Sequence, residues 1–186
     1  MRAPRRPAGG ASGFSLIELL VAVALAGVVT CAGWSWCWSV SRSCANARDR
    51  LEALSSIGFV RRLTTRELSA ATRLLNTPSC SCTNNGLAFA VPTPDGRGLQ
   101  EVTYGWNAAR GIVWRKASGS HLVEGATRFD VCYADQAGRG LACGSDGRLD
   151  EAARPAVRTV ELTLTVVVGR QAVTRRWRVA LPAGTS

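Results

Sequence analysis

In this chain of 186 residues, the residue types that support catalysis or metal binding form no recognisable site. His121 is the only histidine, and no cysteine nucleophile or serine motif lies near it, so a surface position is favoured over an active site. Asp146, Asp150 and Glu151 are close enough in sequence to share a calcium ion, but their spacing matches no calcium loop, which favours a solvated acidic loop. With no phosphate loop or nucleophile elbow either, the sequence predicts neither an enzyme nor a cofactor-binding protein.

The seven cysteines form no Cys-x-x-Cys pair and no Cys/His group, so they predict no zinc site. We interpret those beyond the N-terminal apolar run as extracytoplasmic thiols that can pair, and the odd total leaves at least one free or bound to another chain. Cys132 and Cys143 flank a glycine-containing loop, which a bond between them would stabilise by up to about 3 kcal/mol. Cys80 and Cys82 are too close for an unstrained mutual bond, so one of them is an alternative partner for a distant cysteine.

An apolar run over residues 13–33 is long enough to cross a bilayer, which takes about 20 residues, yet it contains Glu18. A carboxylate there costs about 2 to 3 kcal/mol, so we expect Glu18 to have a specific task rather than to be a tolerated charge at the membrane edge. Residues 1–12 are basic and free of acids, which is typical of a cytoplasmic leader. The run is too long for a cleaved secretory signal. Lipidation at Cys31 is an alternative, although Thr30 is unusual before a lipidated cysteine.

The formal net charge of +10 comes almost wholly from arginine, with Lys116 as the only lysine. Such a balance is typical of proteins that contact nucleic acid or anionic lipid, but here the charges are scattered along the chain. The densest group is Arg175, Arg176 and Arg178, of which only the last two would share a face of a strand. Contact with DNA through this pair is therefore an alternative to a general preference for arginine in the composition.

Residues 39–77 have the pattern of an amphipathic helix that continues from the apolar run. Trp34, Trp36 and Trp38 lie between the two, where an aromatic belt at the far membrane surface would fall. Beyond them, apolar or small side chains recur every three or four residues at Ile57, Val60, Thr64, Leu68, Ala71 and Leu75. Because a residue before proline avoids helical dihedrals, Pro78 predicts that the helix ends at residue 77.

Residues 78–186 show the shorter alternations that predict β-strands. The predicted strands cover residues 87–91, 102–106, 111–116, 127–133, 160–168 and 173–181. The last two form the clearest hairpin, with a turn at residues 169–171, whereas residues 134–155 have the composition of a loop. The predicted fold is α+β, with a long N-terminal helix whose second half packs on an antiparallel β-sheet.

The sequence Gly13-Phe14-Ser15-Leu16-Ile17-Glu18, between a short basic leader and an apolar helix, resembles the class III signal of type IV pilins and type II secretion pseudopilins. The resemblance implies that a prepilin peptidase cleaves after Gly13, removing residues 1–13, and methylates the amino group of Phe14. It also implies that residues 14–38 insert into the bacterial inner membrane, with the C-terminal domain in the periplasm. Glu18 is then the fifth residue of the mature chain, and we hypothesise that it neutralises the amino terminus of a neighbouring subunit in a filament.

The chain is also similar to J-type minor pseudopilins and W-type minor pilins over residues 61–75, 122–129 and 157–165, although its cysteine content departs from the J-type pattern. This similarity implies a pilin-like fold and a minor subunit that primes or caps a filament. The implied partners are other pilin or pseudopilin subunits and an inner-membrane assembly platform. Such a filament would be either a type II secretion pseudopilus or a type IV pilus, and both alternatives stay open. From a different class, a single-pass or lipid-anchored extracytoplasmic binding protein that does not polymerise is the alternative.

Overall fold

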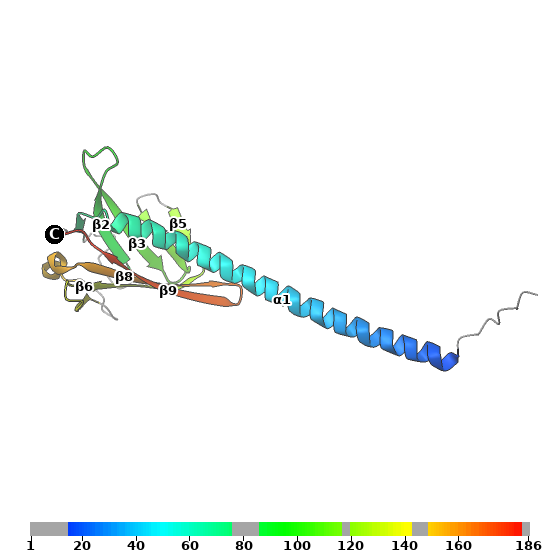
Figure 1. Cartoon of the computed structure of the whole chain (residues 1–186). Coiled ribbons are helices and arrows are strands. Elements are labelled where there is room, and N and C mark those ends of the chain that lie inside the picture. The colour runs from blue at the N-terminus through cyan, green and yellow to red at the C-terminus, as the bar shows by residue number, and fades with distance from the viewer. Residues whose placement is uncertain (1–14, 76–85, 117–119, 143–148, 184–186) are drawn as a thin grey trace, which may run out of the picture. The chain divides into compact units, whose positions relative to one another are not determined.

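A computed structural model describes residues 15–75, 86–116, 120–142 and 149–183 (Figure 1). The chain divides into two compact units, Met1–Ala45 and Asn46–Ser186. One helix, α1 (Leu16–Leu68), contributes to both units. The predicted leader of residues 1–13 and the cysteines Cys80, Cys82 and Cys143 lie outside the described residues.

The part of α1 that belongs to the first unit is apolar on every side up to Trp38, apart from Glu18 in its first turn. From Leu16 to Ala45 every side chain is exposed, and the helix is long and apolar enough to cross a membrane. The hydroxyl of Thr30 donates a hydrogen bond of 2.7 Å to the carbonyl of Ala26, so this polar group is satisfied within the helix, as an apolar surrounding requires. The guanidinium of Arg42 lies 5.6 Å from the ring centre of Trp38, a cation–π contact at the end of the apolar run.

The part of α1 in the second unit is amphipathic. Its buried residues recur every three or four positions and form one face: Ala53, Ile57, Val60, Thr64 and Leu68. The hydroxyl of Thr64 donates to the carbonyl of Val60 at 2.8 Å, which allows a polar side chain on this buried face. The predicted apolar repeat is therefore confirmed as far as Leu68.

The strands that follow form two antiparallel sheets. The first has the order β1-β2-β3-β4-β5, with β1 (Arg73–Leu74), β2 (Gly86–Pro92), β3 (Leu99–Asn107), β4 (Ile112–Arg115) and β5 (Ser120–Val123). The second has the order β7-β6-β8-β9, with β6 (Ala126–Ala134), β7 (Gly140–Ala142), β8 (Thr159–Val168) and β9 (Gln171–Ala180). A short 3-10 helix, η2 (Glu151–Ala156), precedes β8. The predicted strands are all present, and β7 and η2 lie in the segment predicted as a loop.

The helix ends at Leu68, so the prediction of a helix through residue 77 is wrong. The backbone N–H groups of Thr72 and Leu75 donate to the carbonyls of Ala90 and Ala88 in β2, at 2.9 and 2.8 Å. Pairing with the edge of the first sheet therefore replaces the helical hydrogen bonds of this segment, which a local apolar repeat does not reveal. Leu74 is buried in the new conformation.

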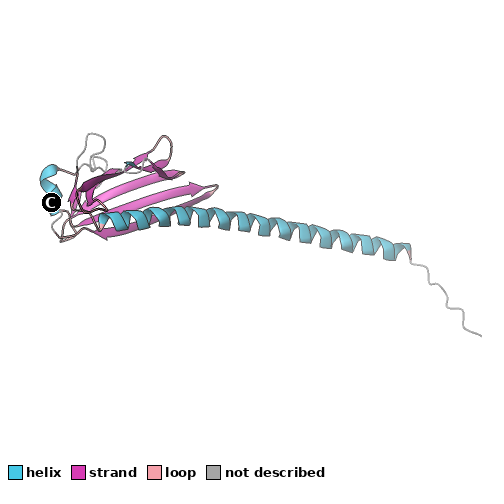
Figure 2. Ribbon diagram, turned by 90° about the horizontal axis from the view of Figure 1, so that it is seen from above, coloured by secondary structure: helices cyan, strands magenta, loops and turns pink. Residues whose placement is uncertain are grey.

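Both sheets and the second part of α1 enclose one hydrophobic core. Figures 1 and 2 show the second part of α1 running along the long strands. Side-chain hydrogen bonds connect the two sheets, from the hydroxyl of Tyr133 to the carbonyl of Gly86 and from the indole of Trp106 to the carbonyl of Ala126, both at 3.1 Å. The α+β prediction, with a long helix packed on antiparallel sheets, is confirmed.

Candidate functional site

Glu18 lies in the first turn of α1, one turn after Ser15, which immediately precedes the helix. The N–H of Leu19 donates to the carbonyl of Ser15 at 3.2 Å, closing that turn. A carboxylate here is favoured by the partial positive charge of a helix N-terminus, and the Ser-x-x-Glu spacing is that of a capping box. Glu18 is exposed, and no ion pair involves it within the described part of the chain.

Gly13 and Phe14, the predicted cleavage and methylation positions, lie outside the described residues and stay a prediction. Apolar side chains lie before and after Glu18 along α1, and such side chains pack against other apolar groups rather than take part in catalysis. The large exposed ones include Leu16, Ile17, Leu19, Leu20, Val21, Val23, Leu25, Val28 and Val29. A contiguous apolar surface of this kind is normally covered, by lipid or by other helices.

The last turn of α1 is held to the first sheet through Glu67. The hydroxyl of Tyr104 donates to one carboxylate oxygen, and Arg115 donates to both, with an Nη2 to Oε1 distance of 2.6 Å. The side chains of Arg115 and Glu67 are only 15% and 14% exposed. Burial, followed by the hydrogen bond to Glu67, raises the pKa of Tyr104 above its ordinary value of 10.0, so Tyr104 stays a donor.

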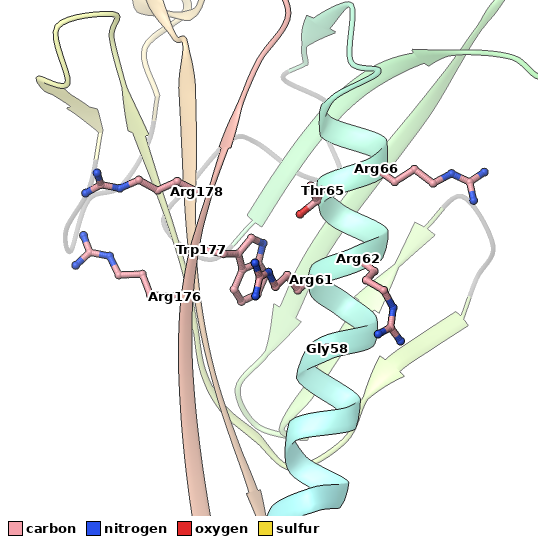
Figure 3. Close-up of a pocket in the computed structure, with 8 residues that line it drawn as sticks. All are labelled: Gly58, Arg61, Arg62, Thr65, Arg66, Arg176, Trp177 and Arg178. Carbon is pink, nitrogen blue, oxygen red and sulfur yellow. The ribbon is translucent and has the colours of Figure 1, made fainter.

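The second sheet holds the same helix from β9. The indole of Trp177, only 6% exposed, donates to the hydroxyl of Thr64 at 3.3 Å. A groove of about 670 Å³ lies beside this contact, which we call the basic groove (Figure 3). Its lining residues come from α1 and β9: Gly58, Arg61, Arg62, Thr65, Arg66, Arg176, Trp177 and Arg178.

Arg176 and Arg178 share the face of β9 opposite to Trp177, as the strand alternation predicts (Figure 3). Both donate to the carboxylate of Glu161 on β8. Burial of Glu161 opposes its ionisation, but the hydrogen bonds from Arg178 and Arg176 outweigh it and lower the pKa of Glu161 below its ordinary value of 4.5. No ion pair reaches Arg61, Arg62 or Arg66 from the residues that the structure describes.

The structure describes only some of the cysteines. Cys132, on β6, is disulfide-bonded, whereas Cys31, Cys37 and Cys44 on α1 are free and exposed. Cys143 lies outside the described residues, so its pairing with Cys132 stays a prediction.

The other candidate residues lie apart from the basic groove. His121, on β5, is exposed, in agreement with the predicted surface position. Asp150 and Glu151 lie at the start of η2, where Glu151 pairs with Arg154 at 3.7 Å. The described ranges contain no group of three potential metal ligands, but they do not include Asp146, so the calcium alternative stays untested.

Sequence reasoning missed the basic groove and the Glu67 cluster. It predicted an amphipathic helix over the residues that include Arg61, Arg62 and Arg66, and it placed Arg176 and Arg178 on one face of a strand. The sequence does not indicate that β9 lies beside this helix. The contact between Trp177 on β9 and Thr64 on α1 joins the two elements, and it links residues far apart in the chain.

The N-terminal segment matches a protein-family model described as the prokaryotic N-terminal methylation motif, over residues 10–30. A search among curated proteins gave no match. The motif supports a type IV pilin-like prepilin signal, and the apolar part of α1 that follows fits membrane anchoring. The chain therefore carries an N-terminal signal of the pilin type, joined to an α+β domain.

Proposed function

We propose that this chain is a minor pilin or pseudopilin, a structural subunit that primes or caps a type II secretion pseudopilus or a type IV pilus. The observation that carries the proposal is the methylation motif at residues 10–30, within which helix α1 begins and continues as an apolar helix up to Trp38. A cleavable signal joined to an apolar helix and a folded domain suits a subunit that is stored in a membrane and then packed side by side with others.

In the proposed maturation, prepilin peptidase cuts after Gly13 and methylates the amino group of Phe14. Glu18, four positions further on, then neutralises the amino terminus of an adjacent subunit. Both charges would be costly among apolar helices if either stayed unpaired, so the pair favours one axial register between subunits. Glu18 is exposed and forms no ion pair with another described residue, which is compatible with such a contact.

The proposed location is the bacterial inner membrane, crossed once by residues 14–38, with the N-terminus in the cytoplasm and the domain of residues 78–186 in the periplasm. The disulfide of Cys132 supports an oxidising compartment. The proposed partners are prepilin peptidase, other subunits of the filament and the inner-membrane assembly platform. The role is structural rather than enzymatic, and the minor class rests on the similarity to J-type and W-type subunits.

The decisive experiment is mass spectrometry of the mature N-terminus, on protein purified from its native membrane. We expect the chain to begin at N-methylated Phe14, and to keep residues 1–13 in a strain without prepilin peptidase, which is the matched control. A lipidated Cys31 would instead identify a lipid-anchored protein, and a chain that keeps Met1 beside an active peptidase would identify a single-pass anchor. Loss of secretion against loss of twitching in a deletion strain then separates the two kinds of filament.

A further inference from the structure

We infer that the basic groove is a binding surface for nucleic acid, which contacts the sugar-phosphate backbone without reading its sequence. The inference goes beyond the proposed assembly role and does not depend on it. It starts from the charge of the groove, where five arginines line about 670 Å³ and Glu161, behind β9, is the carboxylate bonded to two of them. Guanidinium groups suit phosphate oxygens because their planar fork binds two of them at once.

The three helix arginines are available for such contacts. Arg61, Arg62 and Arg66 are exposed, and none takes part in an ion pair among the described residues. The two strand arginines differ from the helix arginines, because both of their guanidinium groups are bonded to the carboxylate of Glu161 on β8. Each guanidinium has five N–H donors, so this contact orients Arg176 and Arg178 while leaving donors for a second anion.

The directions of these side chains favour a polymer over a small ligand. Figure 3 shows Arg62 and Arg66 directed outward from the helix, and Arg176 and Arg178 directed to the far side of β9, with Arg61 between them in this view. The guanidinium groups therefore do not converge on one point, as they would around a single phosphate. The arginines of α1 line one side of the groove and those of β9 line the other, so a chain of phosphates that crosses the groove would meet them in succession.

The lining also favours nucleic acid over an acidic protein. The large apolar side chain in the groove is Trp177, which is only 6% exposed and already donates its indole N–H to Thr64. Protein interfaces take most of their affinity from apolar and aromatic anchors that become buried on binding, and this groove offers no exposed anchor among its lining residues. Binding would therefore be electrostatic, with a strong dependence on salt.

The test uses the full chain in detergent and a fluorescein-labelled DNA duplex of random sequence, whose anisotropy reports binding. Affinity is measured from about 50 to about 200 mM salt. For the triple variant Arg61→Gln, Arg62→Gln and Arg66→Gln, we expect at least about tenfold weaker binding at low salt, and a salt slope that is shallower by about 3. The corresponding lysine triple keeps the charges and should keep most of the slope.

The matched control removes three exposed arginines outside the groove, as Arg97→Gln, Arg110→Gln and Arg170→Gln. This variant should bind within about threefold of the unmodified chain. Equal losses from the two triples would overturn the inference, because they would show attraction to the net charge alone. Displacement of the duplex by polyglutamate as readily as by unlabelled DNA would overturn it in favour of an acidic protein partner. Absence of binding at about 50 mM salt would overturn it as well.

Discussion

The two parts of helix α1 have opposite surroundings although one continuous helix forms both. Up to Ala45 every described side chain is exposed, including Leu25 at 61%, whereas Leu68 near the other end is fully buried. The sequences differ in the same way, since the first part is apolar on every side up to Trp38, apart from Glu18, and the second part is apolar on one face only. A helix that is apolar all round needs a surrounding to bury it, and a helix with one apolar face needs only a core on that side.

The two carboxylates at the ends of α1 show the same contrast. Glu67 has its partners, Tyr104 and Arg115, within the folded domain, whereas Glu18 has no ion-pair partner in the described part of the chain. The second part of the helix is therefore complete in one molecule. The first part has an exposed apolar surface and a carboxylate without an ion-pair partner among the described residues.

Matched leucine substitutions in the two parts test this contrast with the largest expected effect. Leu68→Ala should lower the free energy of unfolding of the domain by about 3 kcal/mol, because it removes buried methyl groups and leaves a cavity. Leu25→Ala, at an exposed position of the same helix, should leave that free energy within about 0.5 kcal/mol. Denaturant unfolding of the full chain in detergent, followed by near-ultraviolet circular dichroism, measures both.

The glutamates provide a second matched pair, with a smaller effect on stability. Glu67→Gln should cost the domain about 2 kcal/mol, because it leaves the guanidinium of Arg115 largely buried without its counter-charge. Glu18→Gln keeps the spacing of a capping box and should leave both unfolding and leader cleavage unchanged. Its effect should appear only in incorporation into filaments, measured by immunoblot of sheared filament fractions.

The outcome for Glu18 also separates two roles of that carboxylate. If Glu18→Gln assembles normally while Glu18→Ala does not, the side chain serves to cap the helix, and the proposed charge pair with a neighbouring amino terminus is wrong. If both variants are cleaved but fail to assemble, the negative charge itself is required.

Much of this fold follows from local patterns in the sequence. The period of the buried face from Ile57 to Leu68 and the alternation in β8 and β9 both reflect which side of an element meets the core, and one sequence is enough to read them. The end of the helix does not follow from a local pattern. Ala71 and Leu75 continue the apolar repeat, but hydrogen bonds to β2, distant in sequence, decide the conformation there.

The candidate sites also differ in whether a local sequence pattern reveals them. Glu18 is conspicuous in the sequence because a single carboxylate interrupts an apolar run. The Glu67 cluster and the basic groove combine residues from the helix with residues far along the chain, such as Arg115 and Arg178, and each residue alone looks like an ordinary surface charge. Only the packing of α1 on both sheets brings them together.

The smallest predicted effect concerns Glu161, whose partners are exposed. Because its pKa is lowered in the folded protein, the ionised carboxylate stabilises the domain above pH 4.5, and this stabilisation is lost as the pH falls through the folded-state pKa. The side chains of Arg176 and Arg178 are 64% and 71% exposed, so solvent screening limits the contribution to about 1 kcal/mol or less.

Glu161→Gln should therefore lower the free energy of unfolding by up to about 1 kcal/mol near neutral pH, and the difference from the unmodified chain should shrink as the pH falls below 4.5 and through the folded-state pKa of Glu161. Glu124→Gln is the matched control, since Glu124 is exposed and has no ion pair among the described residues. Urea unfolding at a series of pH values measures both. A difference that stays constant with pH would mean that Glu161 acts through packing rather than through charge. Arg176 and Arg178 would then not depend on Glu161 for their orientation at the basic groove.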